Sequence, residues 1–144
     1  MMFPMFYHRF DQTSDIRLFT SIDGLHWNQV PGGPVLSLST FNDSSLEFMV
    51  ASKPLLPLPN DRVGIRYSVS RYPHKYPRWK EGLKPGVSGW AWWQKGRLAA
   101  VKADEEGEFE TFSIPVMGAR LRINARTPRG GMIRVGLGPR SIED

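Results

Sequence analysis

The chain has 144 residues, of which 40% are hydrophobic and 23% are charged, and its formal net charge is +5. This length suits one well-buried core and is too short for two large domains. No apolar stretch approaches the roughly 20 residues that a membrane-spanning helix requires, so we expect a soluble protein without a membrane partner. The sequence contains no cysteine, which excludes disulfides and thiolate metal sites but does not select a cellular compartment.

The positive charge does not form a nucleic-acid signature. Basic residues are spread along the predicted strands, acidic turns interrupt them, and no two Lys or Arg residues are adjacent. This distribution favours a solvated sheet face over a phosphate-binding surface. We therefore expect no nucleic-acid partner.

The first part of the chain predicts a β-hairpin. Candidate strands occupy residues 4–10 and 15–21, and the polar residues 11–14 form a turn between them. A second turn follows at Asp23 and Gly24, and the prolines and glycines of residues 31–34 then break the chain. We expect the region up to residue 45 to be irregular.

The middle of the chain alternates strands with proline-rich connections. Residues 46–51 predict a short apolar strand, and residues 63–70 predict a longer one. Between them, residues 54–59 contain three prolines in six positions, which argues against a regular ladder and favours a domain boundary. Residues 72–79 form a long aromatic connection with several prolines.

Residues 89–138 predict consecutive strands with little room for a helix. Turn formers stand at residues 104–107 and 127–131, where Gly provides backbone freedom and Pro fixes φ. Around the second turn, apolar residues alternate with arginines, which predicts one apolar face and one arginine face. Glu108 and Glu110 are expected to pair with these arginines across strands, so the arginine face has a structural explanation.

Together these patterns predict an all-β fold. Residues 46–144 are expected to form an antiparallel β-sandwich of the jelly-roll type. Residues 1–45 are expected to form an N-terminal hairpin segment packed against that sandwich.

The sharpest local motif is S-I-D-G-L-H-W at residues 21–27. Its residue types suit a turn, because Asp23 can accept hydrogen bonds from backbone amides, Gly24 can adopt a positive φ, and Trp27 can pack back on the sheet. We interpret the motif as a hairpin device rather than as a catalytic site.

This S-x-D-G-x-x-W pattern resembles the blade-turn motif of five-bladed β-propeller glycosidases and related glycan-processing hydrolases. It is also similar to the sialidase Asp-box, from which it departs by one residue of spacing. The segments PGGPVL at 31–36, PHKYP at 73–77, GRLAAVKADEEGEFETF at 96–112 and LRINARTPRGGMIRVGL at 121–137 resemble the blade continuation, the propeller-to-sandwich linkage and the C-terminal sandwich of such proteins. The resemblance implies that residues 1–45 are a remnant of the last propeller blade.

The chain departs from that family in its length and in the carboxylates that catalysis would need. Five four-stranded blades need on the order of 200 residues or more, and in the family the catalytic carboxylates come from separate blades. We carry no catalytic role onto Asp23, and Asp11, Asp15, Asp43 and Asp61 show no spacing that predicts a facing pair of carboxylates. The resemblance implies a non-catalytic, carbohydrate-associated accessory module. A small glycoside hydrolase whose site is shared between chains, and a purely structural or interaction domain, remain the alternatives.

Aromatic residues are the candidate carbohydrate-binding groups, because flat rings can serve as platforms for sugars. Trp90 and Trp92 share one face of a predicted strand, whereas Trp93 points to the other. The candidates are Tyr72, Tyr76, Trp79, Trp90 and Trp92. The alternatives are packing in the core or contact with a partner. If a propeller is missing, exposed apolar surface favours self-association, so we expect a homo-oligomer.

Metal and cofactor chemistry find little support. His8, His26 and His74 lack the spacing that places two ligands on one face, so no zinc site is predicted. The acidic tip at residues 104–106 has modest potential as a Ca²⁺ ligand, although such tips are usually just solvated. The sequence lacks a Gly-rich phosphate loop and a nucleophile elbow, and no metal or cofactor is expected.

Overall fold

The computed structural model describes residues 1–52, 54–75, 85–111, 118, 120–136 and 138. Its contacts divide the chain into two compact units, Met1–Lys102 and Ala103–Asp144. Each unit is described by itself. The expected division at residue 45 stays a prediction, although residues from both sides of that position contribute to one core.

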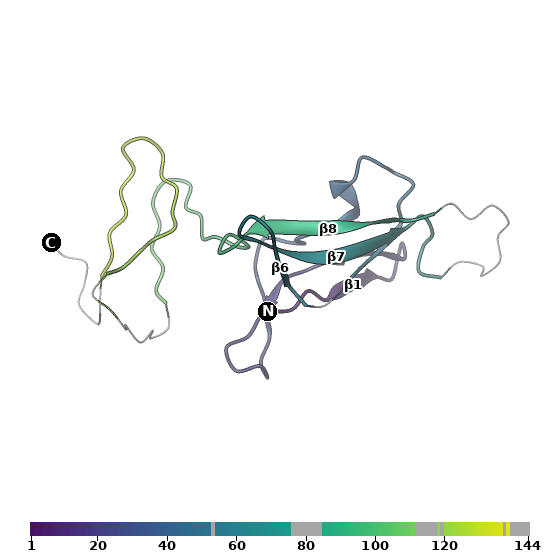
Figure 1. The fold of residues 1–144 in the computed structure, drawn as a ribbon, viewed down its shortest axis with the longest axis horizontal. Helices are drawn as coiled ribbons and strands as arrows, with labels where there is room; N and C mark the ends of the chain where they lie inside the picture. The colour runs from purple at the N-terminus through teal and green to yellow at the C-terminus, as the bar shows by residue number, and fades with distance from the viewer. Residues whose placement is uncertain (53, 76–84, 112–117, 119, 137, 139–144) are drawn as a thin grey trace. The chain divides into compact units, whose positions relative to one another are not determined.

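The protein is all-β, as predicted. Among the described residues there is no α-helix, and one short 3-10 helix occurs. The elements, shown in Figure 1, are β1 (Met5–His8), β2 (Thr13–Ile16), β3 (Phe19–Thr20), β4 (Asn28–Gln29), η1 (Leu38–Thr40), β5 (Phe48–Ala51), β6 (Leu56–Leu58), β7 (Arg62–Ser70) and β8 (Val87–Gln94).

The strands form three small antiparallel sheets that do not close. β1 pairs with β2, and β3 pairs with β4. In the third sheet, β8 pairs with β7 from Arg62 to Val69, while β5 and β6 pair with successive stretches of the other edge of β7. β7 and β8 lie side by side as the two longest strands (Figure 1).

The N-terminal hairpin is confirmed, but both strands are shorter than predicted, and the turn lies at residues 9–12 rather than 11–14. Met5 lies opposite Ile16, and the reversal includes Gln12 at a φ of 61°. The predicted strand at 15–21 is divided, because the backbone of Phe19 exchanges hydrogen bonds with Met2 rather than with β1.

The proline-rich segment corrects one expectation. Residues 54–59 do contain a regular strand, because Pro57 lies in β6, opposite Val63 of β7. β6 is an edge strand of its sheet. Proline is tolerated at an edge, where its missing N–H need not serve a neighbouring strand.

The core lies between the N-terminal segments and the inner face of the third sheet. Its buried side chains are Phe3, Ile16, Leu18, Leu36, Leu46, Met49, Ile65 and Val69. Ile16, Met49 and Ile65 are fully buried. The alternation of partly buried and exposed residues along β8 matches a strand with one face toward this core.

Ser14 joins the N-terminal hairpin to the third sheet. Its hydroxyl donates a hydrogen bond of 2.7 Å to the carbonyl oxygen of Met49 and accepts one of 2.8 Å from the Met49 amide. Ser14 is buried. A side chain of β2 thus satisfies both backbone groups of one residue on β5, where an adjacent strand would otherwise be needed.

The second unit differs from the prediction of consecutive strands. No strand lies among residues 103–111, 118, 120–136 and 138, and all of them are exposed. Within that part of the chain, Glu108 and Glu110 form no ion pair with the arginines. Apolar side chains of these arms, such as Leu121 and Ile133, stay exposed, so the arms lack the burial that stabilises a hairpin in water.

The predicted turn around Thr127 is confirmed, whereas the conformation expected at Gly107 is wrong. The Gly131 amide donates a 2.9 Å hydrogen bond to the Pro128 carbonyl, and Gly130 has a φ of 82°. This combination is that of a tight turn with Gly at its third position. Gly107 does not adopt a positive φ.

We expect Ser14→Ala to destabilise the protein by about 1–3 kcal/mol, because it leaves two buried backbone groups of Met49 without a partner. Urea unfolding followed by tryptophan fluorescence measures this loss. Ser68→Ala is the matched control, since it removes a hydroxyl from an exposed 2.9 Å contact with Ser88. Equal stabilities of the two variants would contradict the role given to Ser14.

Candidate functional site

The outer face of β7 and β8 carries the best candidate site. Register places Arg66 opposite Trp90 and Gly64 opposite Trp92, so these side-chain positions share one side of the sheet. We call this surface the tryptophan face. It comprises Arg62, Gly64, Arg66, Ser68, Ser88, Trp90, Trp92 and Gln94.

The three tryptophans of β8 divide between the faces as predicted. Trp90 is 45% exposed and Trp92 is 50% exposed. Trp93 points to the core side, where its ring stacks on Phe3 with centroids 6.0 Å apart. The core thus holds β8 in place from below, and the other two rings remain in contact with solvent.

Arg62 orients one of the exposed rings. Its guanidinium carbon lies 3.7 Å from the centroid of the Trp92 ring. Such a cation–π contact contributes about 0.5–1 kcal/mol at an exposed site. The Arg62 Nε atom is buried and has no hydrogen-bond partner among the described residues, while the guanidinium stacks on the Trp92 ring.

Gly64 leaves room for the side chains of Leu58 and Trp92 at the centre of the tryptophan face. A Cβ atom at this position would lie 2.7 Å from Leu58 Cδ1 and 2.8 Å from the Ala91 carbonyl oxygen. Both distances are shorter than a van der Waals contact. The absence of a side chain lets Leu58 and Trp92 approach each other over β7, which adds apolar surface beside the ring.

Of the other predicted aromatic residues, the structure describes Tyr72. Tyr72 is partly buried and follows the end of β7, six positions after Arg66, and its amide bonds to the Ser70 hydroxyl at 3.1 Å. Tyr76 and Trp79 lie outside the described residues. Their proposed roles stay predictions.

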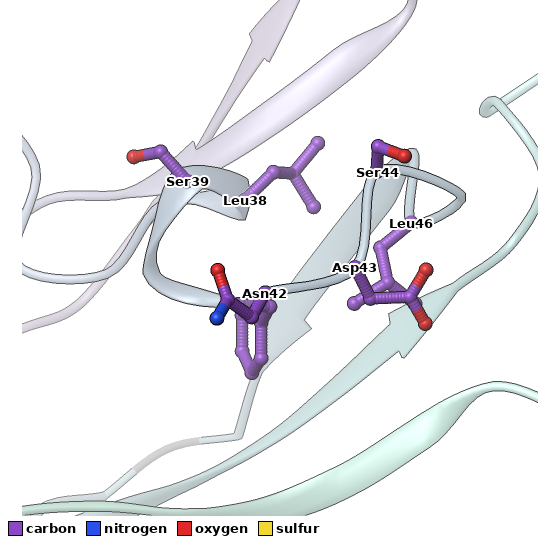
Figure 2. A pocket seen from close by; sticks show the side chains of 7 residues that line it. Leu38, Ser39, Asn42, Asp43, Ser44 and Leu46 are labelled. Carbon is purple, nitrogen blue, oxygen red and sulfur yellow. The ribbon is translucent and has the colours of Figure 1, made fainter.

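A second feature is an open hollow of about 530 Å³ around η1. Figure 2 shows that residues from both ends of this loop border it, with Leu38 on one side and Leu46 on the other. The remaining lining residues are Ser39, Phe41, Asn42, Asp43 and Ser44. Hydroxyl and amide groups beside leucine side chains suit a small polar ligand in general terms.

Internal contacts already occupy the charged group of this hollow. Asp43 accepts hydrogen bonds from the hydroxyl and amide of Ser45 and forms a 2.8 Å ion pair with Arg71. The Ser45 hydrogen bonds, and then Arg71, hold the pKa of Asp43 below its ordinary value against a smaller effect of burial. We therefore assign Asp43 to loop structure.

The Asp23 motif forms a turn between β3 and β4. One Asp23 oxygen accepts the Leu25 and His26 amides at 2.8 Å each, and the other lies 2.6 Å from His26 Nδ1. Gly24 has a φ of 76°. The His26 and Leu25 hydrogen bonds keep the pKa of Asp23 far below its ordinary value. Both carboxylate oxygens are therefore engaged in the turn.

The strongest charge cluster lies on the N-terminal hairpin. Asp15 is buried and contacts His8 Nε2 at 2.8 Å and Arg17 Nε at 2.9 Å. Burial raises the pKa of Asp15, but hydrogen bonds from Arg17 and His8 together lower it below its ordinary value. Arg17 also lies over the Phe6 ring, 4.3 Å from its centroid. The cluster ties the strands together.

Among the described residues, no group of three or more His, Cys, Asp or Glu side chains is placed to hold a metal ion. That search covers the acidic tip at residues 104–106. No helix in the described part of the chain is long and apolar enough to cross a membrane.

Comparisons of the chain with protein families, with curated proteins and with solved structures find no match.

Sequence reasoning missed the arginines of the tryptophan face. Arg62 and Arg66 stand two positions on either side of Gly64, in a segment where a strand was predicted from residue 63. The sequence does show that Arg62 and Arg66 share one face of a strand, because their spacing is a multiple of two. It does not show which strand lies beside that face, because β7 pairs with residues 18 or more positions later in the chain.

We expect Asp15→Asn to destabilise the protein by about 1–3 kcal/mol at neutral pH, through weaker hydrogen bonds to Arg17 and His8. Because folding depresses the pKa of Asp15, its contribution is complete above the unfolded-state value of about 3.9 and is lost as the pH falls through the folded-state value.

The difference between wild type and Asp15→Asn should therefore shrink below about pH 4. Urea unfolding at a series of pH values measures it. Asp61→Asn, at the exposed β6–β7 turn, serves as the control. A difference that stays constant down to pH 2 would argue against an ionised Asp15 as the stabilising species.

Proposed function

We propose that the chain is a non-catalytic, carbohydrate-associated β module. The observation that carries this proposal is the pair of half-exposed tryptophans, Trp90 and Trp92, on one face of β8. Exposed large aromatics incur a cost in water, and two on one surface mark an interaction site.

The chemistry of the face suits a sugar. Indole rings offer flat apolar surface to the C–H faces of a pyranose ring, and neighbouring polar groups bind its hydroxyls. Arg66, opposite Trp90, is exposed, and the hydroxyls of Ser68 and Ser88 lie 2.9 Å apart on the same face. The face thus combines stacking surface with donors and acceptors.

The resemblance to propeller glycosidases gives this proposal its context. The Asp23 motif occupies a turn between two antiparallel strands, as a blade-turn motif would. We propose that residues 1–45 derive from a propeller blade and that residues 46–144 belong to a jelly-roll sandwich. Tyr72, Tyr76 and Trp79 are proposed to extend the sugar platform.

Catalysis by Asp23 is disfavoured on chemical grounds. A catalytic carboxylate needs an oxygen directed at the substrate and a second carboxyl roughly 5–9.5 Å away. Both Asp23 oxygens are hydrogen-bonded within its own turn. Purified protein should not hydrolyse a panel of glycosides, and turnover that disappears in Asp23→Ala would refute the non-catalytic assignment.

For binding, we expect Trp90→Ala and Trp92→Ala each to weaken affinity for a retained polysaccharide by about two- to tenfold, the range for the loss of one ring-stacking contact. Affinity electrophoresis across soluble glucans, xylans, mannans and arabinans, followed by calorimetry, measures the change.

Phe10→Ala is the matched control, because Phe10 is a fully exposed aromatic residue at the β1–β2 turn. It should leave binding unchanged. Phe10→Ala and Trp90→Ala should retain the unfolding free energy of the wild type, whereas Trp92→Ala should lose the roughly 0.5–1 kcal/mol of its contact with Arg62. Failure of every glycan to bind, or binding that survives both tryptophan substitutions, would refute the proposed site.

A further inference from the structure

The outer edge of β8 is a long unpaired strand edge. β8 is hydrogen-bonded to β7 along one edge. No described residue forms a strand pair with its other edge. A row of free backbone N–H and C=O groups of this length is a template for pairing with another strand.

Protective features are missing from this edge. Its sequence, VSGWAWWQ, contains no charged residue and no proline. Natural edge strands are usually short, charged, bulged or covered, because such features prevent pairing between molecules. β8 has eight residues, and its register with β7 runs without a bulge over the whole length of the ladder.

We propose that the edge of β8 pairs with the β8 of a second copy of this chain, in antiparallel orientation, to form one continuous sheet. A second copy is the favoured occupant because the edge is complementary to itself. A two-fold axis makes each strand both donor and acceptor for the other, and closed two-fold dimers are the commonest oligomers.

Side-chain direction restricts the register of this pairing. Directly opposed residues in an antiparallel pair point to the same face. The tryptophan faces of both copies therefore lie on one side of the sheet only if even-numbered positions oppose even-numbered ones. In a two-fold pair the numbers of any two opposed residues have the same sum. When that sum is even, the residue at half the sum lies on the two-fold axis, opposite its own copy.

Side-chain size selects Ala91 as that residue. With Ala91 at the axis, Trp90 opposes Trp92 of the second copy on the tryptophan face, and Ser88 opposes Gln94. On the core side, Trp93 opposes Gly89, which combines a large residue with a small one. In this register aromatic rings pair across strands, and such pairs stabilise antiparallel sheets.

The dimer would also enlarge the proposed sugar platform. Only this part of the inference rests on the proposed function. The dimer would place four tryptophans on one side of a continuous sheet, instead of two. Neighbouring strands are about 4.8 Å apart, so rings from the two copies would form one platform. The chemistry then favours an extended polysaccharide over a monosaccharide, because one chain would contact both copies.

The test begins with sedimentation of the full chain over a range of concentrations, which should show twice the chain mass. Because the chain has no cysteine, single substitutions report the register directly. Ala91→Cys should form a disulfide-linked dimer under mild oxidation, since opposed residues have Cα atoms about 4.5–5.5 Å apart.

Ser88→Cys is the matched control on the same strand. In the proposed register its two copies are separated by about 20 Å, well beyond the reach of a disulfide. The double variant Ser88→Cys with Gln94→Cys should cross-link between copies. It provides a second measurement at exposed positions, should Ala91→Cys perturb the core.

A chain that remains monomeric at every concentration would overturn the proposal, as would a dimer that Ser88→Cys alone cross-links. Cross-linking of both Ala91→Cys and the double variant supports it. Failure of the proposed function is separate: a dimer cross-linked at Ala91 that binds no glycan would refute the sugar platform while the paired edge would stand.

Discussion

The architecture depends on the hydroxyl of Ser14, which joins two hydrogen-bonding systems that share no strand. It satisfies the amide and the carbonyl of Met49, whose side chain is fully buried between the hairpin and the sheet. A buried backbone group without a partner costs about 1–3 kcal/mol, which is more than a typical hydrogen bond contributes. This small polar contact therefore holds β2 against β5 while Ile16, Met49 and Ile65 pack around it.

That arrangement covers one face of the third sheet and leaves the other to solvent. Trp93 stacks on Phe3 on the covered side, so the alternation of a strand forces Trp90 and Trp92 outward. The Tyr67 side chain occupies the space above Gly89 and packs against Phe41, which fixes the inner side of β8 further. The tryptophan face is thus a consequence of how the core is filled, and Arg62 then orders one of its rings.

Local chemistry made several elements predictable. The Asp23 turn is predictable because the carboxylate accepts two nearby backbone amides and Gly24 adopts a positive φ. The strands around Val50 and Ile65 are predictable from their runs of apolar residues. Pro57 shows where local reasoning fails, because a proline is harmful inside a sheet but tolerated at its edge, and only pairing decides which strand is the edge. The described residues beyond 103 show the reverse case: the apolar and charged residues alternate in the sequence, yet no strand forms and all of these residues are exposed.

By itself the sequence determined the all-β class, the tight turns at Asp23 and around Thr127, and the separation of Trp90 and Trp92 from Trp93, because these depend on backbone sterics and on the period of a strand. Only the tertiary structure decided which face of β8 meets the core, that Arg62 and Arg66 lie beside the tryptophans, and that β8 is an edge strand among the described residues. The physical reason is that these features arise from contacts between residues far apart in the chain, whose pairing is selected by burial rather than by local conformation.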